Sequence, residues 1–457
     1  MRMSRETFLG AIGLTVGFLL VGYSAAPRVT GFSPNPESPH VASLAPIRLQ
    51  FNRDMDRISV ETRFGVRPEV PGRTSWEGDT LVFAPLEPWP AGQEIVVQLA
   101  AGSRSTRFLP MLRAFRGSFR TGEARLAFLW PADGPADLYL LTPDNGERVR
   151  LTTSEAGVLE YTPARDGSAI VYAVLRTDGT SELRRLDLIT REDSLVLECP
   201  AGSRCQAPAL SPEGDLLAYE QFEWQTSDSG GRVPGPRQVW LLSLAEGAAP
   251  VQVPPTGQVT SSPIWSPNGL LSFYNVSLRA VGLVRPESLI PINMIPNGLG
   301  LLGSWSPNGD YLLLPEIVFN EEQAAAQDST FSSHLFRVEP ESAVQEDFSV
   351  GQVEDASPAY SPDGEWIAFG RKYLDERWTP GRQLWLMRSD GTEPRPLTDE
   401  PDFNHSSISW NPDSGSLAYV RMSSVDPNLP AEIWVTDLAG SASLLLAEGG
   451  YLPKWIP

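Results

Sequence analysis

The residues that could carry out chemistry are few in this sequence of 457 residues, and they are scattered along it. The histidines His40, His334 and His405 lie far apart, which weakens the case for a zinc site or a histidine-based triad. Lys372 and Lys454 are the only lysines, and this scarcity weighs against lysine chemistry such as Schiff-base formation. We therefore expect neither a metal nor a cofactor.

Familiar catalytic motifs are missing from the sequence. It contains no Gly-x-Ser-x-Gly elbow, no glycine-rich phosphate loop, no His-Glu-x-x-His and no Cys-x-x-Cys. Two carboxylates suffice for glycoside chemistry, and the adjacent pairs Glu321-Glu322 and Asp375-Glu376 are candidates. Adjacent acidic residues in loops are usually solvated surface, so an enzyme is not the class that we expect.

The two cysteines, Cys199 and Cys205, enclose a short segment, Pro-Ala-Gly-Ser-Arg. In an oxidising compartment such a pair forms a disulfide, and we favour this over two separate thiols. A bridge across so few residues shapes a loop more than it stabilises a fold.

Composition excludes several classes of protein. The formal net charge of −20 argues against nucleic-acid binding, which needs clustered cations. The 42 prolines and 39 glycines favour many short elements joined by tight turns over a helical bundle. A hydrophobic share of 41% is sufficient for a core.

The N-terminal segment, residues 1–27, resembles an export signal. Arg2 and Arg5 precede an apolar run that extends from Phe8 to Ala26. We expect an uncleaved single-pass membrane helix with the bulk of the chain outside the cytoplasm. The alternative is a cleaved signal peptide and a secreted or periplasmic protein.

Residues 28–122 read as short alternating strands separated by turns, as in Ile47-Arg-Leu-Gln-Phe51 and Glu94-Ile-Val-Val-Gln-Leu99. This pattern predicts one β-sandwich. The runs Trp76-Glu-Gly-Asp-Thr-Leu-Val-Phe-Ala-Pro85 and Pro90-Ala-Gly-Gln-Glu-Ile-Val-Val-Gln-Leu99 resemble the SbsA-type bacterial Ig-like domain. The resemblance implies an extracytoplasmic spacer.

Residues 123–457 contain an internal repeat: an apolar strand, a Ser-Pro-Asp/Asn/Glu-Gly turn and a second apolar strand. In this turn proline fixes one dihedral angle, and glycine supplies the positive φ that sends the chain back antiparallel. The repeat glycines are Gly167, Gly214, Gly269, Gly309, Gly364 and Gly415. Four strands per repeat at this spacing predict the blades of a β-propeller.

The two ends of the repeat block complement each other. Arg125-Leu-Ala-Phe-Leu129 lacks a preceding motif strand, and Tyr451-Leu-Pro-Lys-Trp-Ile-Pro457 is a motif strand without a successor. The C-terminal strand should therefore close the ring within the first blade. This gives seven blades, or six if the weak repeat at 264–298 is misread. The block resembles the WD-like repeat of TolB-type propellers, which implies an interaction with the cell envelope.

The long insertions lie between the second and third strands of the repeats and gather aromatic residues on one face of the predicted ring. We expect this face to bind a protein or an envelope polysaccharide, with the chain a monomer. The candidate binding residues are Phe222, Trp224, Phe319, Tyr373 and Trp378.

Two other functions remain open on the sequence. A propeller-based glycan lyase or hydrolase would need a polar cluster at the mouth of the central channel, and it predicts Asp355 and His405 in reach of one ligand. A purely structural envelope component would have neither this cluster nor an aromatic patch. The expected fold class is in each case all-β.

Overall fold

The computed structural model describes residues 26–34, 41, 45–86, 89–90, 92–122, 124–143, 145–319 and 332–456. The chain divides between residues 123 and 124 into two compact units. Within the described residues no helix is long and apolar enough to cross a membrane. Residues 1–25, which carry nearly all of the predicted anchor, lie outside the described ranges, as do His40 and Glu321-Glu322.

The first unit is a β-sandwich, as the alternating pattern predicts. One sheet has the order β1-β2-β5-β4 and the other the order β3-β6-β7. Their bounds are β1 Val29–Ser33, β2 Ile47–Phe51, β3 Phe64–Arg67, β4 Gly72–Glu77, β5 Thr80–Pro85, β6 Glu94–Leu99 and β7 Phe115–Arg120. Inward side chains of both sheets, such as Leu49 and Val97, share one core.

A short helix, α2 (Arg57–Glu61), connects β2 to β3 in the first unit. Asp56 caps it, because its carboxylate accepts a hydrogen bond from the backbone of Ser59 at 3.2 Å.

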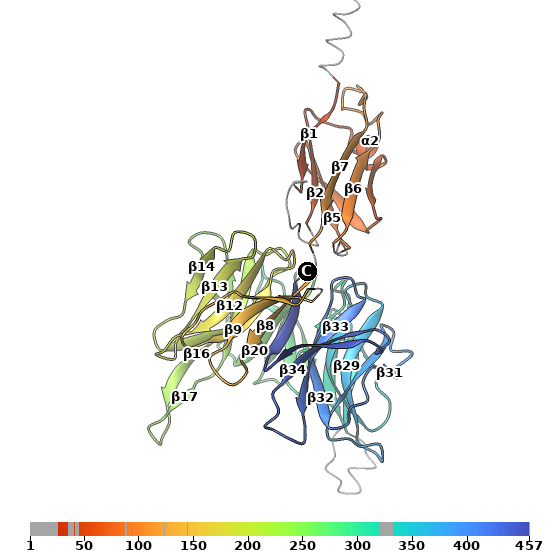
Figure 1. Ribbon diagram of the computed structural model, residues 1–457. Coiled ribbons are helices and arrows are strands. Elements are labelled where there is room, and N and C mark those ends of the chain that lie inside the picture. The colour runs from red at the N-terminus through yellow and green to blue at the C-terminus, as the bar shows by residue number, and fades with distance from the viewer. Residues whose placement is uncertain are drawn as a thin grey trace, which may run out of the picture. The chain divides into compact units, whose positions relative to one another are not determined.

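The second unit consists of antiparallel sheets that follow one another along the chain (Figure 1). Unit 1 comprises β8 Arg125–Trp130, β9 Asp137–Thr142, β10 Glu147–Arg150 and β36 Tyr451–Ile456, and unit 2 comprises β11 Val158–Pro163, β12 Ala169–Leu175, β13 Ser181–Asp187 and β14 Asp193–Glu198. Unit 3 comprises β15 Ser203–Leu210, β16 Leu216–Thr226, β17 Arg232–Pro234, β18 Gln238–Ser243 and β19 Val251–Val253. Unit 4 comprises β20 Thr260–Trp265, β21 Leu271–Asn275, β22 Ala280–Val284 and β23 Pro291–Pro296.

An eight-stranded sheet follows, which we divide into units 5 and 6, and then unit 7. Unit 5 comprises β24 Ser304–Trp305, β25 Leu312–Val318, β26 Ser332–Val338 and β27 Gln345–Asp347. Unit 6 comprises β28 Val353–Tyr360, β29 Trp366–Tyr373, β30 Gln383–Arg388 and β31 Arg395–Pro396. Unit 7 comprises β32 Phe403–Trp410, β33 Ser416–Ser423, β34 Glu432–Asp437 and β35 Ser443–Glu448. Units 5 and 6 are joined by one parallel pairing, between Ser333 and Glu354.

Hydrophobic clusters lie between successive units and hold the second unit together. For example, Tyr172 of unit 2 belongs to the cluster that includes Leu138 of unit 1, and Trp410 of unit 7 packs with Leu386 of unit 6. A further cluster contains Ile433 of unit 7 together with residues of unit 1. Because the last unit packs against the first, the arrangement closes on itself as a β-propeller.

The C-terminal strand makes this closure, as predicted. β36 pairs with β8 in antiparallel register, with Trp455 opposite Leu126 and Ile456 opposite Arg125. The first sheet is thus built from both ends of the repeat block, which the complementary end fragments indicated.

The motif turns have the predicted conformation, with one difference. Gly214 and Gly364 have φ of 75° and 74°, in the left-handed region that favours glycine. In the last repeat, however, Ser414 takes this position with φ of 60°, and Gly415 does not. The extra residue in Asn-Pro-Asp-Ser-Gly shifts the glycine out of register, and Ser414 is retained there with its hydroxyl accepting a hydrogen bond from the backbone of Asp363 at 3.1 Å.

Candidate functional site

A cavity of about 540 Å³ lies where the first strands of units 1 to 4 approach one another. It is lined from β11, β15, β20 and β36, and Arg237 contributes from the segment just before β18. Polar residues on its wall are Glu160, Gln206, Glu220, Arg237, Ser262 and Lys454. We call it the channel cavity, since the first strands surround the centre of the propeller.

A shared backbone irregularity shapes the walls of the channel cavity. The first strands carry bulges in which one residue has positive φ, as at Ala207, Ser262 and Leu452. A bulge leaves backbone groups outside the strand ladder and turns them aside. The backbone N–H of Ser262 is used in this way, donating to Glu220 at 2.6 Å.

Glu220 is buried and already has several partners. Besides the Ser262 N–H, the Gln206 amide donates to its carboxylate at 3.1 Å, and the Arg237 guanidinium lies 3.6 Å from the same carboxylate oxygen. Arg237 remains half exposed at the mouth of the cavity. The buried Glu220 carboxylate thus accepts two hydrogen bonds and faces the Arg237 guanidinium.

Lys454 reaches the channel cavity from β36. Its ammonium donates to the backbone carbonyl of Tyr161 at 2.7 Å and lies 5.2 Å from the centre of the Tyr161 ring. The surrounding protein removes most of the water around the ammonium, and this desolvation lowers the pKa of Lys454, although the charge of Glu160 opposes the effect.

Tyr161 fixes this corner of the cavity. Its hydroxyl lies 2.8 Å from the carbonyl oxygen of Ala127 and 2.6 Å from that of Leu452, so the ring joins β11 to both β8 and β36. The side chain is almost completely buried. The carbonyl that receives the Lys454 ammonium is therefore held in place by three strands.

Glu160 is the least neutralised acidic group of the channel cavity. Desolvation raises its pKa, as does the charge of Glu220, whereas Lys454, a backbone hydrogen bond from Ala207 and the charge of Arg237 lower it. No ion pair joins Glu160 to Lys454 among the described residues, although the two charges influence each other. The cavity thus places a carboxyl group of raised pKa beside an amine of lowered pKa.

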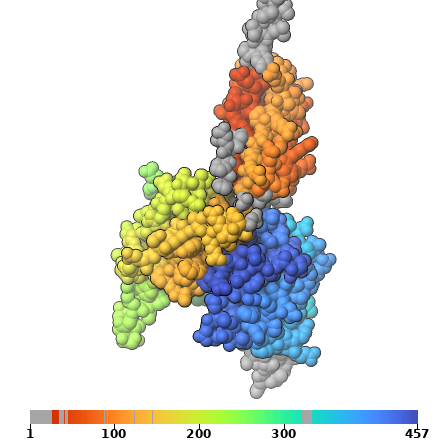
Figure 2. All heavy atoms as spheres, viewed as in Figure 1, coloured from red at the N-terminus to blue at the C-terminus, as the bar shows by residue number. Residues whose placement is uncertain are grey.

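The aromatic residues predicted to bind in unit 3 are held by arginines. Phe222 is buried, and its ring meets that of Trp224 edge-to-face with centroids 5.2 Å apart. The Trp224 ring lies between the guanidinium groups of Arg204 and Arg232, at 4.8 and 5.1 Å, and its indole N–H donates to Gly179. Trp224 therefore stabilises the β16–β17 hairpin, which projects from unit 3 (Figures 1 and 2).

The predicted residues of units 5 and 6 lie elsewhere on the propeller. Tyr373 is covered by the Arg377 guanidinium, 3.6 Å from the ring centre, while Trp378 is 56% exposed beside Lys372. Phe319 follows β25 and is strongly exposed. Within the described part of the chain no ring contact joins Tyr373 or Trp378 to Phe222 or Trp224, and a shared aromatic binding face stays a prediction.

Asp355 does not face the channel cavity. It is fully buried, and the Arg371 guanidinium donates to both of its oxygens at 2.7 and 2.6 Å. Ser349 donates to Asp355 at 2.5 Å and itself accepts from the backbone of Leu335. The network ties β26, β28 and β29 together, a structural role.

His405 also has structural partners. One ring nitrogen lies 2.8 Å from the carbonyl of Arg382 and the other 3.2 Å from the Glu400 carboxylate. Each of the two side chains, Asp355 and His405, is enclosed by its own network, and no hydrogen bond or ion pair joins them among the described residues.

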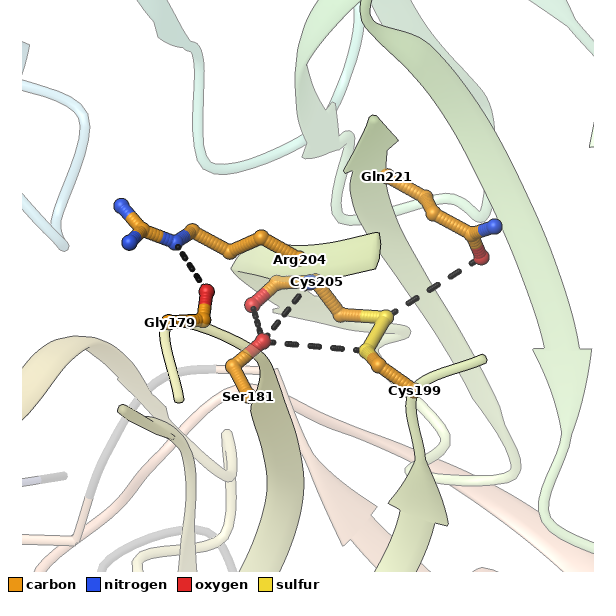
Figure 3. Close-up of a disulfide and its surroundings, with 6 residues drawn as sticks. All are labelled: Gly179, Ser181, Cys199, Arg204, Cys205 and Gln221. Atoms are coloured by element: carbon orange, nitrogen blue, oxygen red, sulfur yellow. Dashed lines mark hydrogen bonds between the residues drawn. A yellow bond between two sulfur atoms is a disulfide. The ribbon is translucent and has the colours of Figure 1, made fainter. Parts of the chain in front are cut away.

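Cys199 and Cys205 form a disulfide, with their α-carbons 6.0 Å apart (Figure 3). The Ser181 hydroxyl donates to the carbonyl of Cys205 at 2.6 Å and accepts from its backbone N–H at 2.7 Å. Arg204, between the cysteines in sequence, is thereby held where it stacks on Trp224.

Metal binding finds no support in the ranges that the structure describes, where no group of three or more His, Cys, Asp or Glu side chains could hold a metal ion.

Sequence reasoning missed the channel cavity. Glu160 and Gln206 lie in first strands that the repeat identified, but Glu220 and Arg237 belong to the second strand and to the segment before the third. One signal was available: Lys454 is one of only two lysines, and it lies on the strand expected to close the ring.

Comparison with known proteins supports both units. Residues 24–121 match the bacterial Ig-like domain family. Among solved structures, oligogalacturonate lyase from Vibrio parahaemolyticus aligns with a TM-score of 0.51 at 15% identity, over 69% of this chain and 87% of that one. TolB from Acinetobacter baumannii aligns with a TM-score of 0.45 at 12% identity, over 86% of this chain and 83% of TolB.

Two curated relatives show weaker likeness in sequence. An uncharacterized peptidase of Bacillus subtilis, YuxL, is 28% identical over 97 residues, which are 21% of this chain and 14% of that protein. The uncharacterized protein Atu1656 of Agrobacterium fabrum is 26% identical over 228 residues, which are 48% of this chain and 66% of Atu1656. The chain combines a bacterial Ig-like domain with a β-propeller, as predicted, and the likenesses to solved structures concern the fold alone.

Proposed function

We propose that this protein is an extracytoplasmic binding protein whose propeller recognises a protein or an envelope glycan through the channel cavity. The observation that carries the proposal is the gathering of Glu160, Glu220, Arg237 and Lys454 around one open space. Pockets of this size with a few convergent polar groups are the usual ligand sites of proteins.

The channel cavity is a better primary site than the aromatic loops. Phe222 and Trp224 already pack against each other and against arginines, so a ligand would have to displace these contacts. Trp378 is exposed and extends from the β29–β30 connection, where it can add a second contact to a large partner.

We assign seven blades to the propeller. Each of units 1 to 7 contains four antiparallel strands, with β17 as an additional strand in unit 3 and β36 as the fourth strand of unit 1, and the parallel pairing between Ser333 and Glu354 connects two blades, units 5 and 6. The repeat at 264–298 supplies β20 to β23 and is counted as a full blade.

The extracytoplasmic location rests on two features. Arg2 and Arg5 followed by the apolar run are typical of exported chains, and the Cys199–Cys205 disulfide suits an oxidising compartment. We propose a membrane anchor, with signal cleavage as the alternative. Protease treatment of intact cells tests whether the chain lies outside the cytoplasm, because an intracellular chain would be protected. Immunoblotting of membranes and culture fluid then distinguishes an anchored protein from one released by signal cleavage.

A glycan lyase or hydrolase is the second candidate. The observation that favours it is the proximity of Glu160, whose pKa is raised, and Lys454, whose pKa is lowered, since such pairs serve as general acid and base. Release of new reducing ends from envelope polysaccharide, lost in Glu160→Gln and Lys454→Met, would identify this activity.

The proposal is tested by quantitative capture from envelope extracts with the full chain as bait. We expect the double variant Arg237→Gln, Lys454→Met to lose the captured partner, whereas Trp224→Ala, Trp378→Ala retains most of it. Mass spectrometry and sugar analysis then identify the partner as protein or glycan. Loss only in the tryptophan variant would move the site to the loops, and equal capture by all forms would refute both assignments.

A further inference from the structure

The charged side chains of the channel cavity differ in how many hydrogen-bond and ion-pair partners they have. Glu220 already receives hydrogen bonds from Ser262 and Gln206 and faces Arg237. The ammonium of Lys454 makes one hydrogen bond, to the Tyr161 carbonyl, among the described residues, which leaves two of its three N–H groups. The Arg237 guanidinium has five N–H groups and, within the described ranges, one carboxylate partner, Glu220, at 3.6 Å.

This imbalance selects for a ligand that supplies hydrogen-bond acceptors. A carboxylate can receive two parallel hydrogen bonds from Arg237 and a further one from Lys454, which are the strong, charge-assisted kind. The short polar side chains of Thr162, Gln206 and Ser262 also line the wall and suit hydroxyl groups, while Trp265 offers an apolar surface. Hydroxyl groups, a ring face and one carboxylate together describe a uronic acid.

We propose that the channel cavity binds a uronic acid unit of an acidic oligosaccharide, with Arg237 and Lys454 as counter-ions of its carboxylate and Glu160 taking up a proton on binding. The inference rests on the proposed function, because it assigns a ligand to the same cavity.

The proton uptake follows from the charges that face Glu160. These are Glu220 on β16, Arg237 before β18, and Lys454 and Tyr451 on β36. A bound carboxylate adds a negative charge beside Glu160 and occupies Lys454, which had stabilised the ionised form. Both changes favour the protonated carboxyl group. The affinity therefore rises as the pH falls through the pKa of Glu160 in the complex, and it levels off below the pKa of Glu160 in the free protein.

The test is isothermal titration of the full chain with cellobiouronate and, as the matched neutral sugar, cellobiose. We expect cellobiouronate to bind at least about tenfold more tightly, one charged interaction being worth a factor of this order. Titrations in two buffers of different ionisation enthalpy should show net proton uptake of up to one per ligand. The affinity should change by at most about tenfold per pH unit.

The variants separate the roles of the three residues. Glu160→Gln should bind cellobiouronate without proton uptake and with little dependence on pH. Arg237→Gln, at a half-exposed position, should lose most of the preference for cellobiouronate over cellobiose. Lys454→Met should lose this preference as well, whereas Lys454→Arg should keep it. Circular dichroism of each variant shows whether the propeller has folded.

The outcomes are separable from those of the proposed function. Equal binding of both sugars, or proton uptake that persists in Glu160→Gln, overturns the uronic acid inference while the cavity remains the site. Binding of an acetylated dipeptide with a free carboxylate, but of neither sugar, overturns it in favour of a peptide terminus. Failure of every probe overturns it too, and the capture experiment then decides the proposed function independently.

Discussion

Asp355 receives both hydrogen bonds of the Arg371 guanidinium in a fully buried position, whereas Lys454 makes a single hydrogen bond among the described residues, to the Tyr161 carbonyl. Burial alone therefore does not mark a functional charge. A buried charge with a complete set of partners stabilises the fold, and one with an incomplete set is available for a ligand.

Replacing Asp355 tests its structural role. Asp355→Ala leaves Arg371 buried without a counter-ion, so we expect the free energy of unfolding to fall by about 3–5 kcal/mol. The neighbouring pair of Glu354 and Arg382 is partly exposed, and Glu354→Ala should cost less than about 1 kcal/mol. Denaturant unfolding followed by tryptophan fluorescence measures both. Similar losses in the two variants would contradict the assignment.

Lys454 shows where prediction at the residue scale ends. Asp355 and His405 were predicted to lie near one ligand, but both are held by partners close in sequence: Arg371 lies opposite Asp355 on the next strand, and Glu400 precedes His405 by five residues. Lys454 meets Tyr161 across 293 positions of sequence. The ring closure that brings these two strands together was predicted, but the contact also depends on the bulge that turns each first strand, which does not appear in residue type or spacing.

Strands and turns were more predictable, because their signals are local. The Ser-Pro-x-Gly turns follow from proline and glycine, and alternation of apolar residues marks the strands that they join. Ser414 is the exception, since an inserted residue moved the glycine and the turn retained its shape with serine. The β16–β17 hairpin was expected only as a long insertion, because its register depends on Arg204, Trp224 and Arg232 stacking together.

The disulfide governs this hairpin more than the whole fold. Cys199→Ser, Cys205→Ser should lower the free energy of unfolding by about 2 kcal/mol, as expected for so short a loop. It should also free Arg204 and change the near-ultraviolet circular dichroism of Trp224. Adding a reductant to the wild type should reproduce both effects and leave the double variant unaffected. Two thiols titrating in the unreduced wild type would refute the bridge.

His334 joins β26 to the end of β27 and to the segment that follows it. Although desolvation lowers its pKa, the hydrogen bonds to Asp347 at 2.7 Å and to the carbonyl of Gly351 at 3.0 Å, with the charge of Asp355, raise it overall. A raised pKa means that protonation stabilises the folded state.

The pH dependence of unfolding tests this contribution. It is fully present below the unfolded-state pKa of about 6.5 and is lost as the pH rises through the higher folded-state value. Between about pH 6 and pH 8, the wild type should therefore lose more stability than His334→Gln. Parallel curves for the two proteins would show that His334 does not contribute in this way.

At the scale of the molecule, closure of the ring depends on the final strand. β36 contributes Trp455 and Ile456 to the clusters that join unit 1 to units 7 and 2. Without it, β8 presents an unpaired edge, and two clusters lose buried side chains.

Truncation after Gly450 tests this dependence. We expect a broadened unfolding transition, binding of a hydrophobic dye in the absence of denaturant and a tendency to aggregate. Leu444→Ala on the neighbouring β35 removes an exposed side chain and should behave as the wild type. A truncated protein that unfolds as cooperatively as the full chain would show that the ring is stable when open.

The contribution of β36 also affects when the protein can act during its synthesis. Tyr161 and Glu160 leave the ribosome nearly three hundred residues before Lys454, so a nascent chain carries most of the cavity wall without the ammonium that completes it. If the channel cavity binds its ligand through Lys454, as proposed, a nascent chain that stops before β36 lacks one of the two cations that hold this ligand. Binding would then report that β36 has joined the propeller.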